Sequence, residues 1–552
     1  MLRASRLVNV FTGEAYDADV ALAGGRVAGI GPGYEGDIET DLAGGFLVPG
    51  LIDAHVHIES SMVPPHEFAR AVVPRGVTTV VTDPHEIANV LGSGGIRYML
   101  SDAAGAPMTM IVNAPSCVPA TGMATSGARL SAADLAELAT DSRILGLAEV
   151  MNFPGVVHAD GRVMAKLRAF RGRVIDGHAP GLAGHALCAY VAAGPSSDHE
   201  ATTVHEAREK LRLGMRLFLR EATNAHNLVD LVPAVTGENA GRVCLCTDDR
   251  QPDDLLGQGS VDHLLRLAIR AGVSPVAAVR MATLNTAEHY ALADVGAIVP
   301  GRWADLVVTA SLEDFQAEVV YRRGQVVARD GALVVASPGA DSSGVRDTVR
   351  VDWGRVDLRI PASGRRIRAI GVVPDQLVTE ALVVDATVVD GLAVADPGRD
   401  LAKMAVIERH RASGKVGLGF VSGIGLGRGA IAGTVAHDHH NLVVIGCDDA
   451  SMLRAARAVA ESGGGLAVAA GDEVLGVLPL PIAGLMSDAA IGEVREILGH
   501  LTAAARDLGS RLHDPFMAMS FLALEVIPSL KLTDQGLVDV DRYEVVPLWA
   551  EE

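Results

Sequence analysis

The chain has 552 residues, 49% of them hydrophobic, and a formal net charge of −20. This length exceeds what one hydrophobic core supports, so we expect two or three domains, and the hydrophobic content excludes intrinsic disorder. The negative charge argues against nucleic acid as a partner, because polyanions are repelled, and leaves small neutral molecules as ligands.

Targeting signals and disulfide patterns are both missing from the sequence. The N-terminal segment has no apolar stretch followed by a small-residue cleavage site, and no run of about 18 uncharged apolar residues occurs. The five cysteines follow no spacing pattern, which is typical of reduced thiols. We therefore expect a cytoplasmic protein that does not bind membranes.

The order of the predicted elements indicates an α/β protein. Residues 1–48 carry short alternating apolar runs that predict small antiparallel strands. Over residues 49–296, eight short apolar strands alternate with amphipathic helical stretches, which predicts a (β/α)8 TIM-type barrel. The strand candidates are FLVPGLIDAHVH, VTTVVTD, MTMIVNAP, ILGLAEVM, RVIDGHAP, GPSSDHE, RLFLREA and RVCLCTDD.

The rest of the chain predicts two further parts. Residues 297–340 return to strands and turns and are predicted to complete a small β-sandwich domain with residues 1–48. A Ser/Gly/Asp-rich stretch, ASPGADSSGVRD, follows as a linker. Residues 348–552 mix helices and strands and are predicted to form a C-terminal α+β domain.

Titratable side chains recur where the predicted barrel strands end. Within PGLIDAHVHIES, Asp53, His55 and His57 share one side of a strand, because residues two apart point the same way. An isolated His-x-His pair is typical of core histidines as well as of metal sites. The repetition favours a site, because the C-terminal strand ends of such a barrel form one rim. The later strand ends carry Asp83, His85, Glu86, Glu149, His178, His199, Glu200, Arg220, Glu221, Asp248 and Asp249.

Longer strings resemble a known family. The motifs DAHVHIES, AEV, DGHAP, SDHE and CTDD resemble the amidohydrolase superfamily, and within it the bacterial adenine deaminases. GLGFVSGIGLGRGAIAGTVAHDHHN, LPLPIAGLMSD and PFMAMSFLALEVIPSLKLTDQGL resemble the C-terminal domain particular to that family. The resemblance covers nearly the whole chain and implies a metal-dependent hydrolase.

The resemblance implies a pair of divalent metal ions, Mn²⁺ or Fe²⁺, and the nitrogen and oxygen donors also permit Zn²⁺. The implied ligands are His55, His57, Glu149, His178, His199 and Asp248. Many relatives bridge the ions with a carboxylated lysine, but the only lysines of this predicted barrel, Lys166 and Lys210, fall in helical segments. We therefore expect Glu149, at the end of the fourth strand, as the bridge.

The implied reaction is hydrolytic deamination of adenine to hypoxanthine and ammonia in purine salvage. A metal-bridged hydroxide would attack C6 of adenine, and Asp248 would carry its proton to the departing nitrogen. Glu149 and Asp248 are thus the expected catalytic residues. Asp83, His85 and Glu86 resemble a family motif that binds the substrate. One of them either orients the purine or protonates its ring nitrogen, or the three form a network that only holds loops.

Several alternatives stay open at this point. Another amidohydrolase, acting on a cyclic amide or a different nucleobase, would share only the barrel, and a scaffold protein could bind metal without turnover. A zinc deaminase with a C-x-x-C motif is excluded, because the sequence has none. We interpret Arg220 and Glu221 as an internal ion pair. For residues 437–440 three alternatives stay open: they reach a neighbouring active site, bind an extra ion or form a solvated turn. The expected partners are adenine, water and further copies of the chain, as a homo-oligomer, most simply a dimer.

Overall fold

The computed structural model describes residues 1–374 and 376–550. It divides into two compact units. Unit 1 comprises Met1–Pro84, Met99–Ser116 and Ser131–Ala340, and unit 2 comprises His85–Tyr98, Cys117–Leu130 and the chain from Asp341 on. Two short segments from the barrel region of the sequence therefore pack with the C-terminal part. The contiguous domain boundaries predicted from the sequence stay a prediction.

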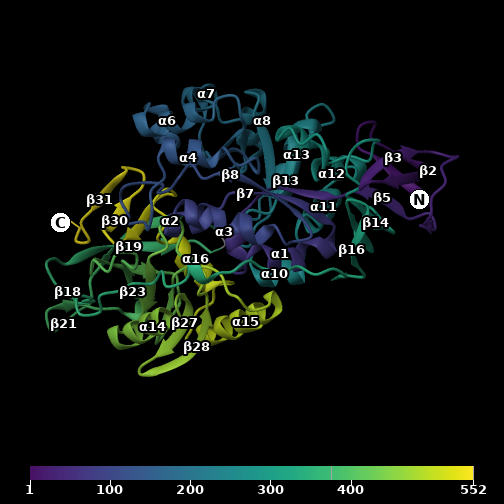
Figure 1. The fold of residues 1–552 in the computed structure, drawn as a ribbon. Helices are drawn as coiled ribbons and strands as arrows, with labels where there is room; N and C mark the ends of the chain where they lie inside the picture. The colour runs from purple at the N-terminus through teal and green to yellow at the C-terminus, as the bar shows by residue number, and fades with distance from the viewer. Residues whose placement is uncertain (375, 551–552) are drawn as a thin grey trace. The chain divides into compact units, whose positions relative to one another are not determined.

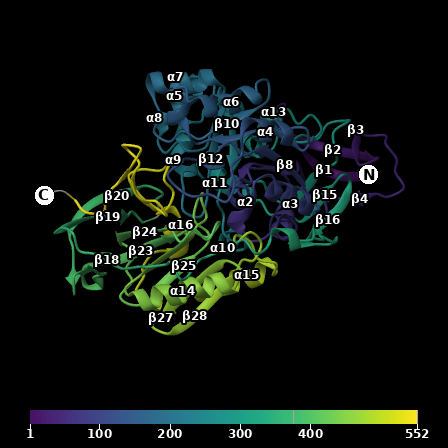
Figure 2. The same cartoon turned by 60° about the vertical axis from the view of Figure 1, so that its left-hand side comes forward.

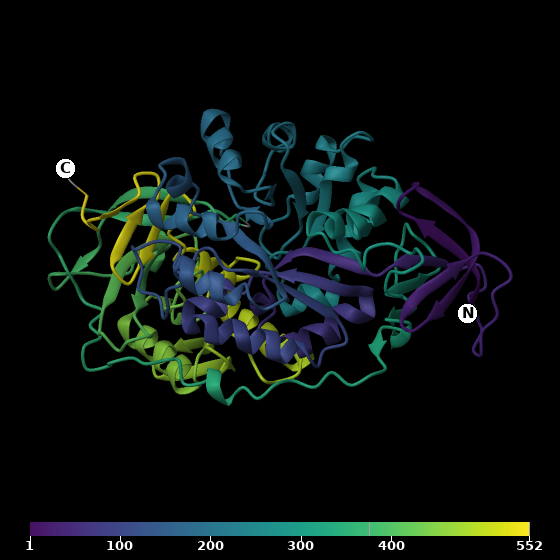
Figure 3. The same ribbon diagram turned by 45° about the horizontal axis from the view of Figure 1, so that its top comes forward.

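Parallel strands form the centre of unit 1 (Figures 1 and 3). They are β6 (Leu51–Val56), β7 (Val77–Thr82), β8 (Thr109–Ala114), β9 (Ile144–Val150), β10 (Ile175–Gly177), β11 (Ser197–Asp198), β12 (Arg216–Arg220) and β13 (Val243–Cys246). Strands β6 to β10 pair in order in one sheet and β11 to β13 in another. Ser196 N donates to Ile175 O at 2.9 Å between β10 and β11, and Asp248 N donates to His55 O at 3.0 Å between β13 and β6. The ring of strands is thereby closed, and the predicted α/β barrel fold is confirmed.

Helices separate consecutive barrel strands. They are α1 (Pro65–Val72), α3 (Ser93–Ala103), α4 (Ala132–Leu138), α5 (Phe153–Val157), α6 (Gly161–Ala169), α7 (Gly184–Ala193), α8 (Val204–Arg212), α9 (Leu228–Leu231), α10 (Pro252–Gly257), α11 (Val261–Arg270), α12 (Pro275–Met281) and α13 (Leu284–His289). Side chains fix several of their starts: Ser131 and Thr203 each accept a hydrogen bond from the backbone N–H three residues later. Among the described residues, every helix is too short or too polar to cross a bilayer.

Strands from both sides of the barrel sequence share one sheet of unit 1 (Figure 1). They are β1 (Leu2–Asn9), β2 (Glu14–Ala23), β3 (Arg26–Ile30), β4 (Thr40–Asp41), β5 (Phe46–Pro49), β14 (Leu306–Thr309), β15 (Val319–Arg322), β16 (Gln325–Arg329) and β17 (Ala332–Leu333). The order is β17-β16-β15-β14-β5-β1-β2-β3, with β4 beside β1. Leu7, Leu47 and Leu306 are buried in its core. The two ends of the barrel segment are therefore hydrogen-bonded into one sheet, through β5 and β14.

A mostly antiparallel sheet of eight strands organises unit 2 (Figure 2). In spatial order it contains β20 (Thr379–Asp385), β19 (Arg366–Val372), β24 (Val416–Ser422), β23 (Leu401–Ile407), β26 (Leu442–Gly446), β25 (Ala430–Gly433), β27 (Gly465–Ala470) and β28 (Glu473–Pro479). Helix α14 (Asp449–Glu461) buries Met452, Ala456 and Val459 against it. The remaining elements are α2 (His85–Leu91), α15 (Ile491–Asp507), α16 (Pro515–Phe521), β18 (Ile360–Pro361), β21 (Val388–Val389), β22 (Leu392–Ala393), β29 (Leu530–Thr533), β30 (Gly536–Asp539) and β31 (Glu544–Val546).

Lys531 on β29 is a fully buried cation in unit 2. Its ammonium nitrogen donates to the carbonyl oxygens of Leu377 and Phe521, both at 2.9 Å. Burial lowers the pKa of Lys531 from 10.5 to about 7. Between these two values the folded state binds fewer protons than the unfolded state, so this residue makes stability rise with pH.

Replacing Lys531 by methionine should therefore stabilise the protein most below pH 7, where the wild type carries the full cost of the buried charge. The gain should be on the order of 3 kcal/mol, because each pKa unit corresponds to about 1.36 kcal/mol and the variant loses two hydrogen bonds. Urea unfolding of Lys531→Met and wild type at pH 6.5, 8 and 9.5 measures it. The gain should shrink steadily towards pH 9.5, and a difference that does not change with pH would contradict the assignment.

Candidate metal centre

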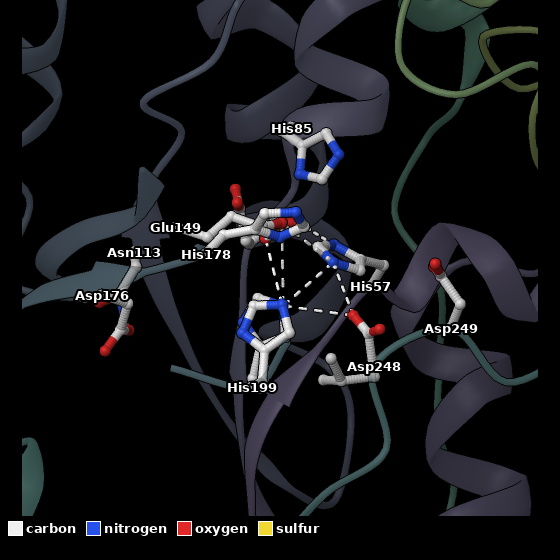
Figure 4. A network of polar contacts seen from close by, with 12 residues as sticks. His57, His85, Asn113, Glu149, Asp176, His178, His199, Asp248 and Asp249 are labelled. Atoms are coloured by element: carbon white, nitrogen blue, oxygen red, sulfur yellow. Dashed lines mark hydrogen bonds and ion pairs between the residues drawn. The ribbon is translucent and has the colours of Figure 1, made fainter. Parts of the chain in front are cut away.

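Six side chains converge at the C-terminal ends of the barrel strands within unit 1 (Figure 4). They are His55, His57, Glu149, His178, His199 and Asp248, the ligand set implied by the sequence resemblance. Each residue is at most 7% exposed. Strands β9, β10 and β11 are consecutive around the barrel and the end of β13 pairs with β6, and parallel strands of a barrel bring all their C-terminal ends to one rim. The structure thus gathers all six predicted ligands in one buried place.

The carboxylate of Glu149, on β9, divides the four histidines into two pairs. Its Oε1 lies 3.3 Å from His57 Nε2 and 3.8 Å from His55 Nε2. Its Oε2 lies 2.6 Å from His178 Nδ1 and 3.2 Å from His199 Nε2. A carboxylate that presents one oxygen to each pair has the arrangement needed to bridge two ions.

Asp248 faces the histidine pair on β6. Its Oδ1 lies 3.1 Å from His57 Nε2 and 3.4 Å from His55 Nε2, and its Oδ2 accepts a hydrogen bond from Arg220 at 3.2 Å. The backbone of Asp248 has φ +56°, a left-handed conformation that is uncommon for residues other than glycine. Two backbone hydrogen bonds to β6 hold it there, Asp248 N to His55 O and His57 N to Asp248 O. Such a conformation is typical of functional positions, where the surrounding structure sustains the strain.

Three of these donors have the separations expected for ligands of one ion. Two donors about 2.1 Å from the same cation lie about 3.0 Å apart at a right angle and about 3.4 Å apart at a tetrahedral angle. The nitrogen atoms His55 Nε2 and His57 Nε2 are 3.1 Å apart, and both lie within 3.4 Å of Asp248 Oδ1. The donor set contains nitrogen and oxygen but no thiolate, so it suits manganese, iron or zinc.

The ionisation states also suit metal binding. Burial lowers the pKa of His199 to about 4, so its imidazole is neutral at physiological pH. Burial by itself would raise the pKa of Glu149, but the charge and hydrogen bond of His178 hold it well below its usual value. The hydrogen bonds of the two β6 histidines and the charge of Arg220 similarly hold the pKa of Asp248 low against its burial. Neutral imidazoles and ionised carboxylates are the forms that ligate cations.

Asp83 contributes to this centre through its backbone. The carbonyl oxygen of Asp83 lies 3.0 Å from His57 Nδ1 and accepts a hydrogen bond from it. This hydrogen bond fixes the tautomer of His57 in which Nε2, the nitrogen facing Glu149 and Asp248, keeps its lone pair. Asp83 therefore orients a predicted ligand.

His85 and Glu86, predicted together with Asp83 as substrate-binding residues, belong to unit 2. Both lie in the first turn of α2 and are buried. His85 Nε2 is 3.4 Å from Asp438 Oδ1, and the two carboxylate oxygens of Glu86 contact His437 and His440. The substrate-binding roles of Asp83, His85 and Glu86 stay predictions.

Both barrel lysines contact groups other than the six predicted ligands. Lys210 is fully buried, and its Nζ donates to Ala179 O at 2.8 Å, to Asp198 Oδ2 at 2.7 Å and to Glu206 Oε1 at 2.8 Å. Lys166 donates to the Ser116 carbonyl at 2.6 Å. Lys210 thereby fixes Asp198, the residue before the predicted ligand His199. Because both lysines bind other groups, the expected bridge between two ions is a carboxylate.

Sequence reasoning missed two contacts around the centre. Arg220 contacts Glu200 and Asp248, whereas Glu221 pairs with His226 at 2.7 Å, so the structure does not show the expected Arg220–Glu221 ion pair. Asp53 accepts hydrogen bonds from the backbone and hydroxyl of Thr247 and so ties β6 to the end of β13. The sequence indicated that Arg220 and Asp53 have partners, because a charged side chain in or at the end of a buried strand needs one. It did not indicate which residues those partners are.

Comparison with known proteins finds two family models along the chain. The amidohydrolase family model matches residues 46–327, and the model of the adenine deaminase C-terminal domain matches residues 376–544. An adenine deaminase from Desulfatibacillum aliphaticivorans is 50% identical over 551 residues, which cover 100% of this chain and 97% of that protein. The adenine deaminase 2 of Carboxydothermus hydrogenoformans is 48% identical over 550 residues, 99% of this chain and 96% of that protein. The similarity thus extends over the barrel and the C-terminal region alike.

Proposed function

Because the chain belongs to the adenine deaminase family of the amidohydrolase superfamily, we propose that it hydrolyses adenine to hypoxanthine and ammonia. The family membership confirms the resemblance that the sequence motifs indicate. The observation that most directly supports the chemistry is the position of Glu149, with one carboxylate oxygen towards each histidine pair.

We propose that the centre holds two divalent cations, Mn²⁺ or Fe²⁺, and zinc also fits the donors. His55, His57 and Asp248 would bind one, His178 and His199 the other, and Glu149 both. When bound, such a pair lowers the pKa of a coordinated water from 15.7 towards ~7 and so supplies a nucleophile at neutral pH.

The protein's own groups then move the proton. We propose that the Asp248 carboxylate accepts it from the attacking water and delivers it to the exocyclic nitrogen of adenine, which departs as ammonia. The hydrogen bonds of His55 and His57 and the charge of Arg220 keep the carboxylate ionised, and the hydrogen bond from Arg220 to Oδ2 orients it before the reaction. Adenine and water together thus yield hypoxanthine and ammonia, with every atom accounted for.

The cellular setting follows the same family assignment. We propose a role in purine salvage in the cytoplasm, which agrees with five cysteines that all stand as free thiols. We also propose that the protein forms a homo-oligomer, most simply a dimer. Light scattering of the purified protein would measure its molar mass.

The substrate assignment predicts ammonia release from adenine and much slower release from adenosine. Adenine and adenosine carry the same exocyclic amine, and adenosine adds a ribose. The family to which the chain belongs is named for deamination of the free base. Purified protein should be screened with adenine, adenosine, cytosine and a cyclic amide such as dihydrouracil. Comparable turnover of adenosine would contradict the proposal, and activity on the cyclic amide alone would assign a different amidohydrolase reaction.

Replacing Glu149 by alanine should remove the metal pair. The variant loses the only carboxylate that faces both histidine pairs among the described residues, so we expect loss of nearly two ions per chain and of nearly all activity. Metal analysis and ammonia release on the same sample measure this. Glu221→Ala is the control, because Glu221 is a buried strand-end glutamate that pairs with His226 instead. Full metal content and full turnover in Glu149→Ala would exclude it as the bridge.

Replacing Asp248 by asparagine separates proton transfer from metal binding. Asparagine keeps an oxygen that can touch a cation but cannot accept a proton at neutral pH. General acid–base groups contribute about 10²–10⁴-fold, so turnover should fall at least that far with both ions retained under excess metal. Asp305→Asn is the control, because its carboxylate accepts a hydrogen bond from Arg323 N at 2.7 Å within the nine-stranded sheet. A loss of only a few-fold at full metal occupancy would assign the proton transfer to another group.

A further inference from the structure

A buried tyrosine joins the ends of β9 and β10 within unit 1. Tyr190 lies on α7, and its side chain is fully buried. Its hydroxyl accepts a hydrogen bond from His178 N at 3.0 Å and donates one to Val150 O at 2.8 Å. Given the proposed metal pair, on which this inference rests, we propose that Tyr190 is a positioning residue. It sets the separation of the Glu149 carboxylate and the His178 imidazole, and thereby the affinity of the second cation site.

The two backbone groups that this hydroxyl joins belong to, or adjoin, two of the proposed ligands. Val150 directly follows Glu149, and the other group is the amide of His178 itself. Glu149 Oε2 lies 2.6 Å from His178 Nδ1. Because metal–ligand distances tolerate deviations of only about 0.2 Å, a small shift between the two strand ends decides whether both donors reach one ion.

The pairing of β9 with β10 is irregular at this place. The register of the two strands shifts just before Gly177, which is the last residue of β10 and is paired with Val150. The tyrosine hydroxyl then links the next residue, His178, to the same Val150. A Cβ on Gly177 would lie against Ser197 O and 3.1 Å from Tyr190 Oη. Glycine before the ligand thus leaves room for the hydroxyl between the strand ends.

The next strand and helix of the barrel repeat the arrangement with a charged side chain. Lys210 on α8 donates to Asp198 Oδ2 at 2.7 Å, and Asp198 precedes the other histidine of the second site, His199. Each histidine of this site is therefore anchored by a buried side chain from the helix that follows it. Groups that orient a ligand without binding the ion are a regular part of metal sites.

Replacing Tyr190 by phenylalanine removes the hydroxyl and keeps the ring. His178 N and Val150 O then lose their shared partner in a buried place, which is costly. They can bond to each other only at about 2.9 Å, so the strand ends would have to close together and carry His178 towards Glu149. We therefore expect the second site to bind its ion about 10–100-fold more weakly, whereas the first site, with its other ligands from β6 and the end of β13, keeps its affinity.

Metal retention against a chelator tests this expectation on the holoenzyme. Mn²⁺-loaded wild type and Tyr190→Phe should be dialysed against a graded chelator series, and the metal content of each sample measured. Tyr190→Phe should fall from about two ions to about one at a chelator concentration about 10–100-fold lower than the wild type does. Tyr321→Phe is the matched control, because Tyr321 is a buried tyrosine in the core of the nine-stranded sheet.

The outcomes separate the tyrosine from the metal pair itself. Retention of both ions by Tyr190→Phe at wild-type chelator concentrations would overturn the positioning role and leave the proposed pair intact. Loss of both ions together would also overturn it, because the role concerns the second site alone. A wild type that binds fewer than two ions would contradict the proposed pair, and the link between the strand ends is then decided by a measurement that needs no metal.

That measurement is amide hydrogen exchange of the metal-stripped protein. The His178 amide should exchange about tenfold faster in Tyr190→Phe than in the wild type. The internal control is the Leu147 amide, which donates to Val174 O at 2.9 Å between the same two strands and should be unchanged. Equal protection of His178 in both proteins would overturn the link. If Tyr190→Phe does not fold, the wild type alone decides, because an unprotected His178 amide contradicts the link and a protected one supports it.

Discussion

The carboxylate of Glu149 is the constraint around which the barrel rim is arranged. One of its oxygens faces the β6 histidines, and the other faces the histidines that follow β10 and β11. The strands that carry these histidines must therefore end at the level of Glu149 on β9. A closed barrel of parallel strands meets this condition, because its strand ends lie at one rim. The distance between the two oxygens of one carboxylate then sets the spacing of the two histidine pairs.

Neighbouring groups hold the ligands of this centre in place. The Asp83 carbonyl selects the tautomer of His57, and Arg220 holds the free oxygen of Asp248. Lys210 anchors the residue before His199 through a fully buried ion pair with Asp198. Breaking such a pair leaves a buried charge and costs several kcal/mol, so these groups restrict the ligands to one geometry even before any cation binds.

The barrel and the place of the candidate ligands in it could be predicted from the sequence. Each candidate lies at the C-terminal end of a short apolar strand, and these ends meet at one rim of a parallel barrel. Glu149 could be predicted as the bridging carboxylate from the absence of a lysine at the fourth strand. The pairing of Arg220 with Glu200 and Asp248 could not, because it depends on how far neighbouring strands are staggered. The packing of α2 with the C-terminal part also has no local signal: His85 and Glu86 follow a barrel strand, and only the fold brings Asp438 to them.

The insertion of the barrel into the nine-stranded sheet has a consequence for synthesis of the chain. Val48 of β5 pairs with Val307 of β14, so the ribosome must add 259 residues before that edge of β5 is covered. At about 5–20 residues per second this takes roughly 13–52 s. During that interval β5 presents an open, apolar edge, which is the kind of surface that joins to other chains.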